Sequence, residues 1–173
     1  MDAVDSCLKS PAKIVLIGGS AVILAHGVTT TTVDIDTLNG VTAALEHAFE
    51  EAYQLTGLRP PVSHSGVAFV PERYEERLVR QATGGLLELW VLEKHDLAIS
   101  KVVRGDERDR QHLRAIHEHD PFEFEILVAR FKDEMLPIYV GDESRPIARF
   151  LWIIEELFGE LRRARVERAL KRQ

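Results

Sequence analysis

The chain of 173 residues contains a single cysteine, Cys7, so it cannot form an internal disulfide. This excludes the disulfide-stapled class of secreted domains and favours a reducing compartment, the cytoplasm. No apolar run approaches the roughly 20 residues that a membrane-spanning helix needs. The first ten residues are acidic and lack the basic region and apolar core of a signal peptide. Composition therefore predicts a cytoplasmic globular protein without a membrane partner.

Positive charge is also scarce. The net charge of −6 at pH 7 argues against a broad nucleic-acid-binding face, because phosphate contacts need clustered Lys and Arg. The exception is the tail, where residues 162–173 carry six basic side chains against one acid, Glu167. Such a block suits contact with RNA or an acidic partner. A solvated last helix with cations near its C-terminal end is the simpler explanation.

What the sequence does contain is a glycine turn followed by two acids. The apolar run 14–17 ends abruptly at Gly18–Ser20, which is typical of a buried strand that turns into a helix. Glycines let the backbone approach a ligand closely, and the N–H groups at a helix start suit a phosphate. After a thirteen-residue spacer come Asp34 and Asp36, which strand periodicity places on one face. Two adjacent carboxylates repel each other unless a cation joins them, and Mg²⁺ binds such groups together with substrate phosphates.

This order, Gly-Ser and then Asp-x-Asp after ten to thirteen residues, resembles the nucleotidyltransferases of the DNA polymerase β superfamily. The surrounding sequence, IGGSAVILAHG and a threonine-rich run into VDID, is most similar to the small bacterial branch of AbiEii-type toxin relatives and minimal nucleotidyltransferases. The resemblance covers roughly residues 13–40 and 86–116. It implies an α/β fold, a small mixed sheet with flanking helices. The implied reaction moves a nucleoside monophosphate from an NTP to a hydroxyl and releases pyrophosphate.

The resemblance also implies roles for individual residues. Asp34 and Asp36 would bind one or two Mg²⁺ (or Mn²⁺) ions, and the superfamily's third carboxylate would be Glu88 on the apolar strand 86–92. The alternative for Glu88 is a solvent-facing glutamate on an edge strand. The residues expected to cradle the triphosphate are Gly18, Gly19 and Ser20.

A second hallmark of the branch is a lysine followed by an Arg-Asp pair, matched here by Lys101 and Asp109. The lysine would neutralise triphosphate charge as a point cation. Asp109 would hold that lysine or an arginine in place, or accept a proton from the incoming hydroxyl. The alternative is two amphipathic helices with solvated charges.

Periodicity predicts strands at 13–17 and 86–92, one through Asp34 and Asp36, and a possible fourth at Val67–Val70. It predicts helices at 2–10, 20–26, 41–56, 96–103, 107–119 and 120–135, and one long helix from near Pro146. We expect residues 1–119 to form the nucleotidyltransferase-like domain. Residues 120–173 would form a helical extension whose apolar stripe, which includes Leu161, packs on the lysine-bearing helices.

Three functions fit these observations. The first is an active Mg²⁺-dependent enzyme whose acceptor is an RNA or tRNA 3′ end or a protein hydroxyl. The second is a nucleotidyltransferase-like antitoxin or binding module that grips a cognate toxin with little turnover. The third is a sensor that binds NTP without transferring it.

Overall fold

The computed structural model describes residues 1–26, 34–64 and 69–171 and has a mixed α/β fold, as the sequence predicts. The chain forms two compact units. The sheet unit comprises Met1–Ala68 and Leu78–Leu92, and the helical unit comprises Phe69–Arg77 and Glu93–Gln173. The chain thus enters the helical unit briefly, returns to complete the sheet, and then stays helical.

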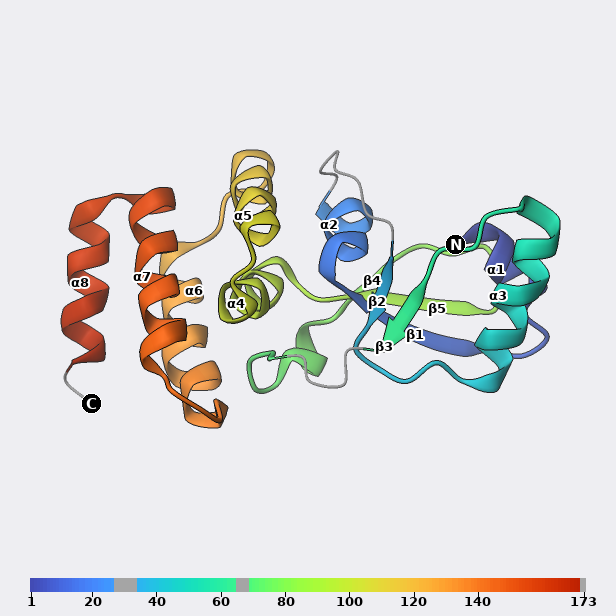
Figure 1. Ribbon diagram of the computed structural model, residues 1–173, viewed down its shortest axis with the longest axis horizontal. Coiled ribbons are helices and arrows are strands. Elements are labelled where there is room, and N and C mark those ends of the chain that lie inside the picture. Colours follow the sequence, from blue (N-terminus) through green and yellow to red (C-terminus); the bar gives the residue numbers. More distant parts are fainter. Residues whose placement is uncertain (27–33, 65–68, 172–173) are drawn as a thin grey trace. The chain divides into compact units, whose positions relative to one another are not determined.

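The sheet unit is built on five strands in the order β3-β2-β1-β5-β4 (Figure 1). Strand β1 is parallel to β5 and antiparallel to β2, β3 is parallel to β2, and β4 is antiparallel to β5. The strands span β1 Ala12–Ile17, β2 Ile35–Thr37, β3 Val62–His64, β4 Val79–Arg80 and β5 Leu87–Val91. The helices of this unit span α1 Asp2–Cys7, α2 Gly18–His26 and α3 Ala43–Thr56.

One face of this sheet is apolar and buried. Ile14 and Leu16 of β1 are fully buried, and Leu89 of β5 lies on the same face, because partners across a ladder share a face. Helix α3 begins at its N-cap Thr42, whose hydroxyl accepts a hydrogen bond from a backbone N–H, and packs beside α1 (Figure 1). Alternation along β1 then places Ile17 on the opposite face.

The side chain of Asn39 extends the sheet hydrogen bonding beside β1. Its Oδ1 accepts from the Val15 N–H at 2.7 Å, and its Nδ2 donates to the Lys13 carbonyl at 3.0 Å. A side-chain amide carries one acceptor and two donors, so it can replace a neighbouring strand. Asn39 therefore anchors the segment that follows β2 along the middle of β1.

The helical unit consists of helices and contains a buried aromatic pair. Its elements are η1 Tyr74–Arg77, α4 Lys94–Arg104, α5 Glu107–His119, α6 Phe124–Ala129, the π-helix Arg130–Met135, the short turn Leu136–Ile138, α7 Ser144–Phe158 and α8 Glu160–Leu170. Phe131 and Phe150 are fully buried and stack with ring centroids 3.8 Å apart. Helix α4 packs on α5, α6 and α7.

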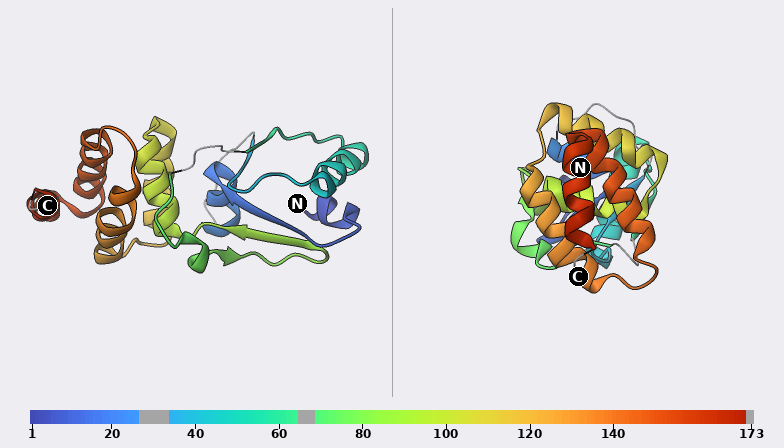
Figure 2. Two further views of the ribbon diagram at one scale, coloured as in Figure 1. Left: turned by 90° about the horizontal axis from the view of Figure 1, so that it is seen from below. Right: turned by 90° about the vertical axis from the view of Figure 1, so that its left-hand side faces the viewer.

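The prediction of one long final helix was wrong. Gly159 has φ +88°, a left-handed conformation that suits glycine, and it separates α7 from α8, which lie side by side (Figures 1 and 2). The apolar stripe predicted for this helix consequently does not continue across the break. Leu161, expected in that stripe, is 89% exposed.

The strand expected at Val67–Val70 lies partly outside the described residues, and residues 69–70 are not in a strand. Within the described part of the chain, none of the helices has both the length and the apolar character required to cross a membrane.

Candidate active site at the end of β1

The turn from β1 into α2 is held in contact with Asp36. Gly18 has φ +67°, which favours glycine, and a Cβ at this position would overlap Asp36 Oδ2 and lie 3.2 Å from its Cγ. The β1–β2 register explains the approach, because Ile17 and Asp36 are directly opposite each other. The expected proximity of the glycine turn and the second aspartate is therefore present, and it requires a residue without a side chain at position 18.

Asp36 also accepts a hydrogen bond from β3. Ser63 lies opposite Asp36 in the β2–β3 ladder, and its hydroxyl donates to Asp36 Oδ1 at 2.7 Å. Sequence reasoning missed Ser63, because a strand of three residues shows no recognisable alternation. The Ser63 hydroxyl thus positions the half-buried Asp36 carboxylate, and Gly18 leaves the space that this carboxylate occupies.

Asp34 lies at a bend immediately before β2 and is half-buried. Asp36 lies within the strand itself, so their sharing of one face remains a prediction. Across residues 1–26, 34–64 and 69–171, no cluster of three or more acidic, histidine or cysteine side chains could hold a metal ion.

Ser20 is buried in the first turn of α2. Its hydroxyl donates to the Ile17 carbonyl at 3.0 Å, and its exposed fraction is 6%. The Ser20 hydroxyl, a donor expected to contact phosphate, therefore already donates to the backbone of the turn. The half-buried Gly19 precedes it at the helix start, where backbone N–H groups have no partner within the helix.

The residues at the end of β1 suit a hard divalent cation. Mg²⁺ is usually bound by one or two carboxylates and keeps its other positions for water and phosphate oxygens. Asp34 and Asp36 supply such carboxylates, and the missing side chain at Gly18 keeps bulk away from Asp36. The Asp36 carboxylate beside the glycine turn therefore fits the ion that the resemblance implies, with Asp34 as the expected second ligand.

Glu88 does not lie beside Asp36 in the sheet. It lies opposite Lys13 in the parallel β1–β5 ladder, whereas Asp36 lies opposite Ile17. Four residues of extended chain separate these positions by roughly 13 Å along β1. The structure therefore does not bring Glu88 next to Asp36.

Lys101 and Asp109 form a buried ion pair inside the helical unit. Lys101 Nζ lies 3.0 Å from Asp109 Oδ1, and their side chains are 2% and 1% exposed. Arg104 donates to both oxygens of the same carboxylate, at 2.8 and 2.6 Å. The carboxylate does hold both a lysine and an arginine in place. The roles expected for the pair in triphosphate binding and proton transfer stay predictions.

The electrostatics of this pair favour a charged Asp109. Burial by itself raises the pKa of Asp109, but the hydrogen bonds from Arg104 and the charge of Lys101 outweigh it and hold the pKa below its usual value. His112 lies 3.2 Å from Lys101 Nζ, and burial together with the lysine charge lowers its pKa. A carboxylate with a lowered pKa is a weak proton acceptor.

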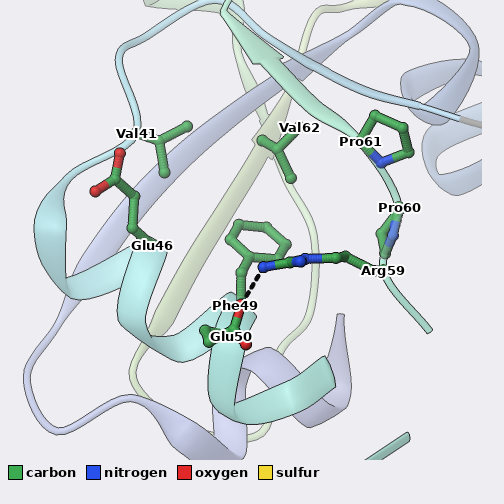
Figure 3. A pocket seen from close by; sticks show the side chains of 8 residues that line it. All are labelled: Val41, Glu46, Phe49, Glu50, Arg59, Pro60, Pro61 and Val62. Carbon is green, nitrogen blue, oxygen red and sulfur yellow. Dashed lines mark hydrogen bonds and ion pairs between the residues drawn. The ribbon is translucent and has the colours of Figure 1, made fainter. Parts of the chain in front are cut away.

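A cavity of about 390 Å³ lies elsewhere in the sheet unit, between α3 and the segment leading into β3 (Figure 3). Its apolar lining includes Phe49 and Val62, and the Arg59 guanidinium reaches across it to Glu50 (Figure 3). Val62 lies opposite Ile35 in the β2–β3 ladder, so it faces away from the side that carries Asp36. This cavity is consequently separate from the glycine turn.

Comparison with known proteins adds one finding. A family model described as "Nucleotidyltransferase of unknown function (DUF6036)" matches residues 2–162, which is nearly the whole chain. No curated protein and no solved structure matches the chain.

Proposed function

Because the chain belongs to this family of nucleotidyltransferases, we propose that it moves a nucleoside monophosphate from an NTP to a hydroxyl acceptor in a Mg²⁺-dependent reaction. The observation that carries the proposal is the contact between Gly18 and the Asp36 carboxylate. It joins the two halves of the sequence motif at one place. The narrower relationship to AbiEii-type proteins is part of the proposal.

The glycine turn binds the triphosphate in this proposal. The backbone N–H groups at the start of α2, at Gly19 and Ser20, point toward an anion placed before the helix. The Ser20 hydroxyl supports the turn through its bond to Ile17. The Ser20 side chain thus shapes the phosphate site, and the main chain supplies the donors.

Asp34 and Asp36 are the residues that would hold Mg²⁺ or Mn²⁺. A bound divalent ion neutralises phosphate charge and stabilises the attacking and leaving oxygens of an in-line displacement. Ser63 donates a hydrogen bond to one oxygen of Asp36, and the absence of a side chain at Gly18 leaves room for the other. This restraint orients the carboxylate before any ligand arrives.

The chemistry is a displacement at the α-phosphorus of the NTP. The acceptor hydroxyl oxygen forms a bond to that phosphorus, and the bond to the oxygen that bridges the α- and β-phosphates breaks. Pyrophosphate leaves, and the hydroxyl proton is released to solvent. Among the described residues, no basic side chain pairs with Asp36. The negative charge of Asp36 and of the phosphates would therefore be balanced by the divalent cation during the displacement.

In this proposal, Lys101 and Asp109 hold α4 and α5 in place relative to each other. Their buried contact joins α4 to α5, and Asp109 carries two cations on one carboxylate. Glu88 has no place at the proposed metal because the strand register separates it from Asp36. The metal site therefore rests on the two aspartates.

The test is label transfer by the whole chain. Each α-labelled NTP is incubated with Mg²⁺ and with total tRNA or candidate proteins, using the natural chain, Asp36→Asn and Asp2→Asn. Asp2 is an exposed acid at the start of α1 and serves as the matched control. We expect transfer with the natural chain and Asp2→Asn, and a loss of at least about a hundredfold with Asp36→Asn.

An antitoxin or binding module is the competing function. It predicts no transfer to any acceptor and stable co-purification with a partner protein. Transfer that persists undiminished in Asp36→Asn would remove this carboxylate from the reaction and overturn the proposed site.

A further inference from the structure

The face of the sheet that carries Asp36 also carries Trp90. Asp36 shares a face with Ile17 through the β1–β2 ladder, and Trp90 shares a face with Val15 through the β1–β5 ladder. Val15 and Ile17 are two residues apart on β1, so all four side chains are on one side. Trp90 is thus about 7 Å from Asp36 along the strand direction and two strands away, roughly 10 Å across the sheet.

Two cations flank the Trp90 ring on this face. Lys13 Nζ, from β1, lies 5.3 Å from the ring centroid, and the Arg80 guanidinium, from β4, lies 5.9 Å from it. Both cationic side chains are exposed, and Trp90 is partly exposed. Within the part of the chain that the structure describes, neither cation has an ion-pair partner. Glu88 stands opposite Lys13 in the ladder, yet Lys13 contacts the ring instead.

The indole N–H of Trp90 is buried and has no hydrogen-bond acceptor among the described residues. A buried donor without an acceptor is unfavourable. It is the one such side-chain atom in residues 1–26, 34–64 and 69–171. The cluster Lys13–Trp90–Arg80 therefore combines an aromatic surface, two unneutralised cations and an unused donor.

We propose that the cluster Lys13–Trp90–Arg80 binds a single-stranded nucleic acid, which presents its terminal hydroxyl as the acceptor. A base stacks on Trp90, and the flanking phosphates contact Lys13 and Arg80. This inference rests on the proposed function, since it names the acceptor of the same reaction. A few nucleotides span the distance from Trp90 to Asp36.

The chemistry of the cluster favours a single strand over the other acceptors. A duplex hides its bases and needs a wide basic surface, whereas the chain is acidic overall and this patch has two cations. An acidic protein segment would pair with the cations but gain little from the partly exposed indole. A single strand offers both phosphates and the faces of its bases.

Trp90 itself reports on binding. The chain has two tryptophans, and Trp152→Phe leaves Trp90 as the sole indole fluorophore. This variant is titrated with single-stranded RNA and DNA of one sequence, without NTP and without divalent metal. We expect saturable quenching of Trp90 fluorescence, because a stacked base quenches indole emission. The RNA and DNA arms show which sugar the site prefers.

The decisive variant is Lys13→Ala with Arg80→Ala in the same background. We expect affinity to fall at least about tenfold, with a weaker dependence on salt. The matched control is Arg145→Ala with Arg168→Ala, which removes two exposed basic side chains of the helical unit that form no ion pair among the described residues. Circular dichroism and melting temperature check that each variant is folded.

The outcomes separate this inference from the proposed function. Quenching that is lost in the Lys13/Arg80 variant and kept in the control and in Asp36→Asn supports the cluster, whether or not transfer is detected. The inference is overturned by no quenching with either strand, by an equal loss in the control, or by quenching by NTP alone that the oligonucleotides do not compete. Labelling of a protein acceptor with no oligonucleotide binding would do the same.

Discussion

The two units differ in how their carboxylates are paired with cations. In the helical unit, Asp96 is fully buried and accepts hydrogen bonds from Arg77 and Arg130, and the buried pair Lys101–Asp109 is likewise matched. In the sheet unit, the half-buried Asp36 has a serine hydroxyl and a glycine backbone as neighbours. Paired buried charges hold helices together, whereas a carboxylate with no cation beside it leaves a charge for a ligand to balance.

The contrast indicates where to look for function in this chain. Lys101 and Asp109 of the helical unit contact each other in its interior, and their expected roles with the triphosphate stay predictions. The Asp36 carboxylate is positioned by Ser63, and no basic side chain neutralises it within residues 1–26, 34–64 and 69–171. Variants that test this difference should affect stability in the helical unit and ligand response in the sheet unit.

The largest expected effect is on the buried ion network around Asp96. Asp96→Ala leaves Arg77 and Arg130, which are 20% and 15% exposed, without their shared carboxylate. We expect the free energy of unfolding to fall by about 3–5 kcal/mol, measured by urea denaturation. Asp133→Ala, an exposed acid paired with Lys132, should cost less than about 1 kcal/mol. Equal losses in the two variants would show that buried pairing does not distinguish the helical unit.

The second effect is a dependence of the free energy of unfolding on pH. Burial raises the pKa of Glu93, but contacts from His95 and Arg130 outweigh it and lower the pKa from 4.5 to about 2. A pKa that is lower in the folded state gives stabilisation that is present above pH 4.5 and is lost as pH falls toward 2. The loss should be about 3 kcal/mol, since each pKa unit corresponds to about 1.4 kcal/mol.

Glu93→Gln tests this assignment. Unfolding free energies measured between pH 2 and pH 6 should fall less steeply in this variant than in the natural chain. Glu118→Gln, an exposed acid of α5, should leave the slope unchanged. An unaltered slope in Glu93→Gln would assign the acid sensitivity to other carboxylates.

The parts of the fold that sequence predicts are those with local causes. The apolar run of β1, the periodic face of α3 and the glycines that end α3 and α4 each act over a few residues. Gly57 and Gly105 both adopt positive φ at those helix ends. These signals do not depend on the rest of the chain, and the predicted elements therefore match the structure to within a few residues.

The parts that sequence could not predict depend on partners far along the chain. Strands β3 and β4 contain three and two residues, and they exist because β2 and β5 lie beside them. Ser63 was missed with β3, and Glu88 was expected at the metal because its strand register was unknown. The approach of Asp36 to Gly18 was expected from motif order alone, and the ladder supplies its physical reason.

The third effect tests the glycine turn. Gly18→Ala forces a side chain into a left-handed backbone and against Asp36, and we expect a loss of about 2 kcal/mol in stability. We also expect NTP with Mg²⁺ to raise the melting temperature of the natural chain and to give no such rise in Gly18→Ala. Gly40→Ala is the matched control, because a Cβ there meets nothing within 4 Å and its φ is not positive. A ligand-induced rise that survives in Gly18→Ala would separate the turn from the nucleotide.

The smallest effect concerns Ser63, which joins β3 to the proposed metal site. Ser63→Ala removes the hydrogen bond to Asp36 Oδ1 but, because Ser63 is exposed, should change stability by less than about 1 kcal/mol. The less restrained carboxylate should raise the Mg²⁺ concentration for half-maximal transfer by roughly three- to tenfold. Ser6→Ala removes an exposed hydroxyl in α1 and should leave that concentration unchanged. Ser63→Ala could instead lower stability strongly and leave the Mg²⁺ dependence intact. Ser63 would then serve the packing of the sheet. The contrast between the two units would be weaker than their charges indicate.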